Sequence, residues 1–389
     1  MTEKNKSVKK FPNLRFPGFD EEWENKKLGE IATFSKGKGI SKNEIVDNGE
    51  TECIRYGELY TFYEEVISQI QSKTNTDISS LVLSEANDVI IPASGETQID
   101  IATASCVLKS GVALGGDLNI IKTKNNGVFL SYYLNSKKKL EIAKLSQGIS
   151  VVHLYSSQLA LLNLKLPQFE EQKKLANFLS LLNSRIQTQK KIISQLKSQM
   201  SNLKDLIFEQ QLRFKNDKEN EFPDWKGSKL EDICEKKSSN ISANKIEDNV
   251  GNYPIYGATG ILKSIDFYEV ENDYVSIIKD GAGVGRLIYC KGKSSVLGTL
   301  DIIQSKNVNL YFIFLLLSRI DFKKYITGST IPHIYFKDYK KENFQIPSIK
   351  EQEKIANFFK LLDDKINTES SLLIQYENQK KYLLQNLFV

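Results

Sequence analysis

The chain has 389 residues, a length that suits two ordinary domains, each large enough to bury a core of its own. Its residues are 40% hydrophobic and 26% charged, and this balance excludes an intrinsically disordered chain. A net charge of +5 is compatible with nucleic-acid binding but does not demonstrate it.

Neither a membrane span nor a signal peptide is evident. The longest apolar run, which includes 311–317, is much shorter than the roughly 20 residues that a transmembrane helix needs. Residues 1–10 are polar and basic and lack the apolar core of a signal peptide. We therefore expect a cytoplasmic protein. The four cysteines lie far apart without any C-x-x-C pair, so we interpret them as buried free thiols.

Short β-branched runs broken by glycine predict strands, with 88–91 and 274–278 as the clearest examples. Helical segments are expected around 128–145 and 310–325. Two globular modules of the α/β (α+β) class, each with an irregular sheet, fit this pattern best.

A long helix follows each module. Pro167 and Pro347 end extended segments, and a helix is predicted to begin within a few residues of each. Apolar residues then recur at alternating steps of three and four, with polar interruptions at Gln189, Glu369 and Lys380, and this pattern is typical of a coiled-coil seam. The two seams consist of the following residues: Leu175, Leu179, Leu182, Ile186, Ile193, Leu196, Met200, Leu203 and Ile207, and Ile355, Phe359, Leu362, Ile366, Leu373, Tyr376, Leu383 and Leu387.

The whole chain is an internal repeat. Residues 163–178 match residues 343–358 at a shift of 180 positions without a gap, and His153 matches His333 at the same shift. Trp23 matches Trp225 at a longer shift, because the first module has about twenty more residues.

The ends of the chain also match the repeat. Residues 14–16 (Leu-Arg-Phe) resemble residues 212–214, which directly follow the first helix, while the chain stops at the equivalent of Phe208. We therefore predict that the two ends meet, with pseudo-two-fold symmetry and antiparallel long helices. The predicted domains are a first globular module, a central helix, a second globular module and a C-terminal helix: 14–165, 166–212, 213–345 and 346–389.

Motifs of DNA-modifying enzymes are missing. The eight prolines are all isolated, which excludes the Asn/Asp-Pro-Pro-aromatic loop of amino-methylating enzymes. No Walker A sequence occurs, and the glycines of 281–286 lack the dinucleotide-binding spacing. His153 and His333 have no matching catalytic acid or nucleophile in both copies. The sequence predicts no catalytic, cofactor-binding or metal-binding residue.

The blocks 167–176 and 347–356 share the form Pro-x-x-x-Glu-Gln-x-Lys-Leu/Ile-Ala, and 16–23 reads Phe-Pro-Gly-Phe-x-x-x-Trp. With the repeated architecture, these blocks resemble the specificity (S) subunit of Type I restriction-modification enzymes. The resemblance implies a non-catalytic subunit whose two modules are target recognition domains, each reading one half of a split double-stranded DNA sequence. It also implies helices that set the spacing between the modules.

Partners follow from the same resemblance. The helices would dock two methyltransferase (M) subunits, and restriction/translocase (R) subunits would join outside them. No cofactor is expected in this chain, because S-adenosylmethionine, ATP and Mg would belong to the partner subunits.

Candidate site residues come from the loops of the modules, including the two matched histidines, and from the repeat-matched segments at which the long helices begin. Gly, Thr, Gln, Lys and Arg in the loops are suited to close approach and to phosphate or base-edge contacts. The DNA-contact candidates are Ser94, Thr97, Gln98, Ser150, His153, Thr259, Lys279, Arg286, Thr330 and His333. The candidates for partner docking are Glu171, Gln172, Asn177, Glu351, Gln352 and Asn357.

A second interpretation stays open at this point. The same architecture would suit a structural adaptor that presents two protein-binding modules on a coiled coil, because the mild net charge does not exclude it. The DNA sequence that the modules would read does not follow from the residues.

Overall fold

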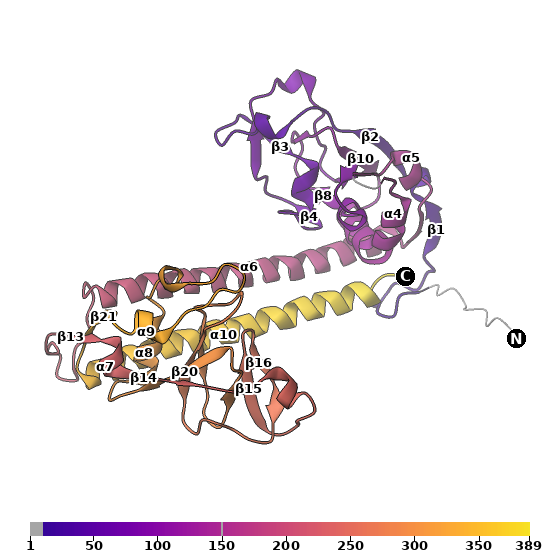
Figure 1. Cartoon of the computed structure of the whole chain (residues 1–389). Helices are drawn as coiled ribbons and strands as arrows, with labels where there is room; N and C mark the ends of the chain where they lie inside the picture. Colours follow the sequence, from indigo (N-terminus) through magenta and orange to yellow (C-terminus); the bar gives the residue numbers. More distant parts are fainter. Residues whose placement is uncertain (1–10, 149–150) are drawn as a thin grey trace, which may run out of the picture. The chain divides into compact units, whose positions relative to one another are not determined.

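The computed structural model describes residues 11–148 and 151–389. The chain divides into two compact units, Met1–Lys191 with Ser371–Val389, and Ile192–Ser370. Two long helices, α6 (Phe169–Phe208) and α10 (Ile349–Asn386), each begin in one unit and end in the other. Figure 1 labels many of the helices and strands of both units.

The first unit contains short strands with helical segments between them. Its strands are β1 (Glu24–Lys27), β2 (Ala32–Lys36), β3 (Thr51–Ile54), β4 (Val66–Ile67), β5 (Ser72–Thr74), β6 (Asp88–Pro92), β7 (Ser94–Gly95), β8 (Ser105–Val107), β9 (Ala113–Leu114), β10 (Leu118–Thr123), β11 (Val152–His153) and β12 (Asn163–Leu166). Its short helices are α1 (Leu28–Ile31), α2 (Gln98–Ile101), α3 (Gly127–Tyr133), α4 (Lys139–Leu145) and α5 (Ser156–Leu159), with 3-10 turns at Lys42–Glu44, Tyr56–Leu59 and Ile78–Ser80 and a π-helical turn at Leu134–Lys138.

The second unit repeats the arrangement with fewer elements. Its strands are β13 (Lys226–Lys229), β14 (Cys234–Ser238), β15 (Tyr253–Gly257), β16 (Gly260–Ile265), β17 (Tyr274–Ile278), β18 (Leu287–Cys290), β19 (Ser295–Val296), β20 (Leu300–Ser305) and β21 (Asn343–Ile346). Its short helices are α7 (Leu230–Ile233), α8 (Leu310–Leu317) and α9 (Phe336–Tyr339), with 3-10 turns at Ala243–Ile246 and Phe322–Tyr325.

The sheets show that the sequence repeat is also a structural one. The main sheets have the orders β2-β10-β6-β8-β4 and β14-β20-β17-β18, so their first three strands correspond. Each unit also has a three-stranded sheet that contains a parallel pair, β3 with β9 and β15 with β19. The strand before each long helix pairs antiparallel with the first strand of its module, β12 with β1 and β21 with β13. The strand register therefore shows which residues of the two modules are equivalent.

The predicted elements agree with this structure. The strands expected at 88–91 and 274–278 are β6 and β17, which are buried along their whole length because they lie inside the main sheets. The helix expected at 128–145 is present, although a π-helical turn divides it. Its counterpart at 310–325 is shorter, because α8 ends at Leu317 and only a 3-10 turn follows. Both long helices begin where predicted, two residues after Pro167 and Pro347.

Each module has a core built around an equivalent tryptophan. Trp23 packs edge-on against Phe129, and Trp225 packs edge-on against Phe312. A phenylalanine at the end of a long helix, or two residues beyond it, completes each core. Phe388 lies 5.5 Å from Phe129 between ring centroids, and Phe208 lies 5.4 Å from Phe312.

The predicted meeting of the two chain ends is confirmed within the first unit. The backbone N–H of Leu14 donates to the carbonyl of Asn386 (3.0 Å), and Asn13 Nδ2 donates to Asn386 Oδ1 (2.8 Å). Residue 14 therefore follows the last turn of α10 in space, although the two are at opposite ends of the chain.

Several residues of the predicted apolar seams are buried in each unit. In the first unit Leu175, Leu179 and Ile186 of α6 are buried. In this unit α6 and α10 are antiparallel. Asn183 of α6 contacts Lys380 of α10, whereas Lys190, further along α6, pairs with Glu377, which comes earlier in α10. In the second unit Ile355, Phe359 and Ile366 of α10 are buried, and Leu203 of α6 packs against the same core as Ile355 and Phe359.

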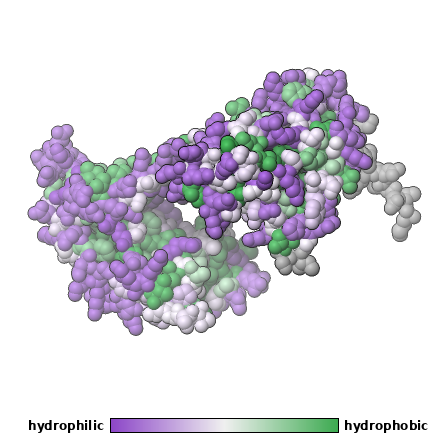
Figure 2. Space-filling view, turned by 90° about the horizontal axis from the view of Figure 1, so that it is seen from above, coloured by the Kyte–Doolittle hydropathy of each residue, from purple (hydrophilic) through white to green (hydrophobic). Residues whose placement is uncertain are grey.

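Hydrophilic side chains predominate on the face shown in Figure 2, where apolar ones form small patches. Within residues 11–148 and 151–389, no helix combines the length and apolar character that a membrane crossing requires. The interpretation of the cysteines is confirmed, since Cys53, Cys106, Cys234 and Cys290 are all free and buried. Burial raises the pKa of Cys106, Cys234 and Cys290 to about 12, so these thiols are not reactive near neutral pH.

Removal of the Phe388 ring tests whether the chain end completes the first core. We expect Phe388→Ala to lower the free energy of unfolding of the first unit by about 3–5 kcal/mol, because this side chain is 2% exposed. Denaturant unfolding followed by Trp23 fluorescence in a Trp225→Phe background reports on this unit, since the chain has only two tryptophans. Phe62→Ala is the control, because Phe62 is 69% exposed. Equal effects of the two substitutions would contradict the packing role.

Candidate nucleic-acid interface

The two histidines occupy the same structural position. His153 forms a backbone bridge with Ser94 just beyond β6, and His333 forms one with Asp280 just beyond β17. Each histidine also bridges back across its own loop, His153 to Gln147 and His333 to Thr327. The glycine after this second partner has a positive φ in both copies, 121° at Gly148 and 87° at Gly328, which favours glycine in a tight turn. We call residues 93–98 with 147–155, and 279–286 with 327–335, the strand-end loops.

In the second module, hydrogen bonds join three segments that carry candidate residues. The N–H of Gly281 donates to the carbonyl of Pro332 (2.9 Å), which links the glycine-rich loop to the loop of His333. Arg286 is exposed, and its Nη1 donates to the carbonyl of Ala258 (3.1 Å), next to exposed Thr259. These hydrogen bonds therefore join four candidate residues into one connected region: Thr259, Lys279, Arg286 and His333.

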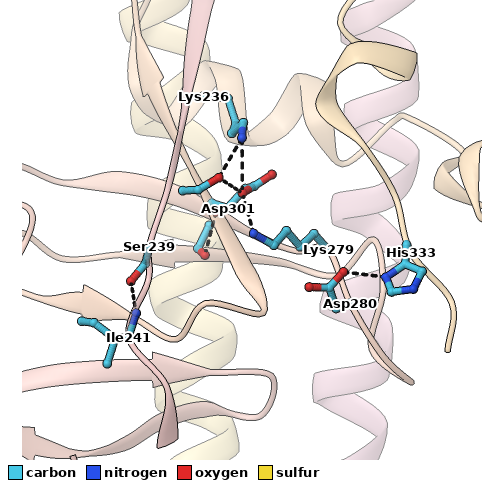
Figure 3. A network of polar contacts seen from close by, with 9 residues as sticks. Lys236, Ser239, Ile241, Lys279, Asp280, Asp301 and His333 are labelled. Atoms are coloured by element: carbon cyan, nitrogen blue, oxygen red, sulfur yellow. Dashed lines mark hydrogen bonds and ion pairs between the residues drawn. The ribbon is translucent and has the colours of Figure 1, made fainter. Parts of the chain in front are cut away.

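A polar network lies at the base of these loops (Figure 3). The buried carboxylate of Asp301 accepts a hydrogen bond from Ser238 Oγ (2.9 Å) and ion-pairs with Lys279 (3.2 Å) and Lys236 (3.7 Å). A buried carboxylate needs such compensation, because desolvation otherwise penalises its charge. Beside it, Asp280 Oδ1 lies 2.7 Å from His333 Nδ1. The network borders an open cleft of about 970 Å³ that Lys306, Tyr335 and Lys340 also line.

The first module has the same backbone with other side chains. Strand register places Asn119 opposite Ile91 in β6, as Asp301 lies opposite Ile277 in β17. Asn119 Nδ2 donates to the carbonyl of Leu154 (2.9 Å), a bond that a carboxylate cannot make.

The neighbouring positions of the network differ in the same way. Ala93 stands at the position of Lys279. The carbonyl of Ala93 accepts the N–H of Leu154, and the carbonyl of Lys279 accepts the N–H of Ile334, the residue after the histidine in each module. Ser94 likewise stands at the position of Asp280. Among the residues that the structure describes, the charged network thus occurs in the second module and not in the first.

An aromatic ring accompanies each histidine. His153 stacks on Tyr155 with ring centroids 6.4 Å apart, and His333 stacks on Tyr335 at 6.3 Å. Both tyrosines are about half exposed, and a lysine lies over each ring, Lys36 in the first module and Lys337 in the second.

The remaining candidate residues differ in exposure. Ser94 is buried, whereas Gln98 and Thr330 are exposed. Thr97 is exposed but caps α2, because its hydroxyl accepts the N–H of Asp100 (3.1 Å). Ser150 lies outside the described residues. The sequence reasoning overlooked Asp280 and Asp301, although both stand where the repeat changes residue type.

The Pro-Glu-Gln segments at which the long helices begin, the helix entrances, make hydrogen bonds within the chain. Arg15 donates from Nε and Nη2 to the two carboxylate oxygens of Glu171 (2.8 and 2.7 Å). Arg213 makes the same bidentate contact with Glu351 (3.2 and 2.9 Å). These hydrogen bonds raise the pKa of both arginines. Both glutamates are buried, so each pair binds the segment that precedes a module to the helix that follows it.

The adjacent glutamines extend this link. Gln172 Nε2 donates to the carbonyl of Pro167 (2.9 Å), and its Oε1 accepts the N–H of Asn126 (3.1 Å), the residue that caps α3. Gln352 repeats both contacts, with Pro347 (2.9 Å) and with Asn309 (2.8 Å), the cap of α8.

The docking candidates consequently fall into two groups. Glu171, Gln172, Glu351 and Gln352 are at most 3% exposed and already hydrogen-bonded inside the chain, so a partner would have to displace them. Asn177 and Asn357 are exposed on the helix surface. Docking through any of these residues stays a prediction.

Comparison with known proteins identifies the family. The family described as "Type I restriction modification DNA specificity domain" matches residues 20–198 and 223–378, which is most of the chain and both halves of the repeat. The chain therefore belongs to the family of specificity subunits of Type I restriction-modification enzymes.

Individual relatives agree with this assignment. The chain is 26% identical to the specificity subunit of the Type I restriction enzyme MjaVIII of Methanocaldococcus jannaschii over 426 aligned positions, which cover 99% of this chain and 95% of the relative. It is 28% identical to a putative type I specificity subunit of Mycoplasma pneumoniae, across 35% of this chain and 48% of the relative. Its fold matches the crystal structure of the S subunit from M. genitalium with a TM-score of 0.72, at 17% identity, across 97% of this chain and 99% of that one.

Disruption of one helix entrance tests its contribution to stability. We expect Arg213→Ala to lower the free energy of unfolding of the second unit by about 3–5 kcal/mol, because Glu351 would stay buried without a partner. The double substitution Arg213→Met with Glu351→Leu should recover most of this loss. Trp225 fluorescence during denaturant unfolding, in a Trp23→Phe background, measures both.

Lys293→Ala is the matched control, because it removes an exposed ion pair with Glu271 that contributes at most about 1 kcal/mol. If Arg213→Ala were no more harmful than Lys293→Ala, the bidentate pair would not secure the second module.

Proposed function

We propose that this chain is the non-catalytic specificity subunit of a Type I restriction-modification complex, in which each module reads one half of a split DNA target. The supporting observation is the contrast between the strand-end loops. Equivalent backbones carry Ala93, Ser94 and Asn119 in one module, but Lys279, Asp280 and Asp301 in the other. A shared scaffold with different side chains suits two modules that read different half-sites by base-edge contacts.

The long helices would set the distance between the half-sites. α6 has 40 residues and therefore extends about 60 Å at 1.5 Å per residue. This length exceeds one turn of B-DNA, which is roughly 35 Å. We propose that α6 and α10 form an antiparallel coiled coil with pseudo-two-fold symmetry, so that the half-sites are separated by unread base pairs. The buried seam residues of both units support this proposal.

The same helices would dock two methyltransferase subunits. Two copies of one partner need two copies of one surface, and the repeat supplies them. Leu181 of α6 and Leu361 of α10 stand at equivalent positions and are 71% and 70% exposed. Asn177 and Asn357 each lie one helical turn earlier and are exposed as well. One related structure is described in connection with complex assembly of a type I system, and it matches this fold with a TM-score of 0.50.

The chemistry would belong to the partners. S-adenosylmethionine would bind to the methyltransferase subunits, and ATP and Mg to restriction subunits. The missing Asn/Asp-Pro-Pro-aromatic loop supports this division, because methylation of a flipped adenine needs such a loop.

Exchange of one module tests the proposed reading of half-sites. Replacement of residues 14–165 by the corresponding module of a relative should change one half of the methylated sequence and leave the other half intact. Sequencing of methylated bases on DNA treated with the chain and its methyltransferase subunits gives the result. The purified chain alone is the control and should methylate nothing. An active hybrid with an unchanged site, or one with both halves changed, would refute the modular assignment.

Substitution of the exposed leucines tests docking. We expect Leu181→Asp or Leu361→Asp to reduce the number of bound methyltransferase subunits from two to one, and the double variant to bind none. Folding should be unaffected, since both side chains are already exposed to water. The mass of the purified complex gives the stoichiometry. Leu140→Asp is the control, because Leu140 of α4 is 68% exposed but lies off the long helices. Two bound subunits on the double variant would exclude this surface.

A further inference from the structure

The second module holds an imidazole at its surface through a carboxylate. His333 Nδ1 lies 2.7 Å from Asp280 Oδ1, and the two side chains are 35% and 31% exposed. The backbones of the same residues are bridged to each other, and His333 is bridged to Thr327 as well. Figure 3 shows the second ring nitrogen, Nε2, on the side of the ring away from Asp280. The ring is thus anchored while its other nitrogen stays available to a ligand.

The contact determines which nitrogen carries the hydrogen. A carboxylate only accepts hydrogen bonds, so Nδ1 must donate to Asp280. In the neutral imidazole, Nε2 then has a free lone pair and acts as an acceptor. Two charged groups on neighbouring strands and loops, Lys279 and Lys236, are paired with Asp301.

The described part of the first module, residues 11–148 and 151–165, shows no such carboxylate–imidazole contact. Its histidine, His153, has the same backbone bridges and the same stacked tyrosine, but it lies opposite Ser94. The two loops thus match in backbone but differ in the residue opposite the histidine, which is Asp280 in the second module and Ser94 in the first. Such a difference could let the two modules read different half-sites.

We propose that His333 is a specificity-determining residue of the second module, and that Asp280 is the positioning residue that keeps its Nε2 an acceptor. The inference rests on the proposed function and deepens it. The ligand group is the exocyclic amino group of a base in the major groove, N6 of adenine or N4 of cytosine, since these are the donors on base edges there.

Methylated-site sequencing with the assembled complex tests this assignment. Asp280→Ala frees the ring to adopt either tautomer, so one position of the second half-site should become degenerate. His333→Ala should relax the same position, and the double variant should relax it no further. Asp280→Asn should retain most of the preference, because its amide oxygen still accepts from Nδ1. Asp338→Asn, an equal change of charge at an exposed residue of α9, is the control.

DNA binding by the same complex supplies a chemical readout. An oligonucleotide whose base at that position lacks the exocyclic amino group should bind the wild-type complex about tenfold more weakly. The Asp280→Ala and His333→Ala complexes should bind both oligonucleotides equally. A purely structural role of Asp280 would instead lower methylation at all sites with the sequence preference unchanged, and that result overturns the inference.

The remaining outcomes separate this inference from the proposed function. If the wild-type complex tolerates loss of the amino group at every position of the second half-site, the acceptor role of His333 is wrong while bipartite recognition stands. If Asp280→Ala changes the half-site of the first module, or the wild-type complex methylates no bipartite site, the proposed function itself fails.

Discussion

A buried glutamate at the start of each long helix, Glu171 in α6 and Glu351 in α10, accepts two hydrogen bonds from an arginine far away in the sequence. A buried carboxylate without a partner is strongly destabilising, so the arginine must stay in place. The neighbouring glutamine then hydrogen-bonds the cap of the module's own helix. Together with the pairing of β1 with β12 and of β13 with β21, these contacts hold each module on the helix that follows it.

The attachment is identical in the two copies, whereas the strand-end loops are not. This division has a physical reason. The helix entrances are buried, and any change there leaves a charge or an amide without its partner. The loops are partly exposed, so their side chains can change while strand register keeps the backbone in place. Asn119 and Asp301 illustrate the exchange, since the first closes a loop through its amide and the second holds two lysines. A duplicated scaffold thereby presents two different surfaces.

The candidate site could be predicted only in outline. The repeat directed attention to His153 and His333, and the structure places them at equivalent bridges. It also directed attention to Glu171 and Glu351, whose repetition reflects internal hydrogen bonds in the described structure rather than an exposed surface. Repetition marks a residue that both copies need, but it does not distinguish a buried contact from a binding surface. Exposure makes that distinction, and it depends on packing.

The linear sequence alone predicts the duplication, the buried strands β6 and β17, the starts of α6 and α10 after Pro167 and Pro347, and several buried residues of the two seams. These features follow from local periodicity, proline stereochemistry and self-similarity, all of which can be read along the chain. Which charges meet, by contrast, depends on how the chain packs in three dimensions. Arg15 is 156 positions from Glu171, and Asp280 is 53 positions from His333. The sequence shows that buried or fixed charges need partners, but the choice among many lysines, arginines and carboxylates is made by strand register and helix packing.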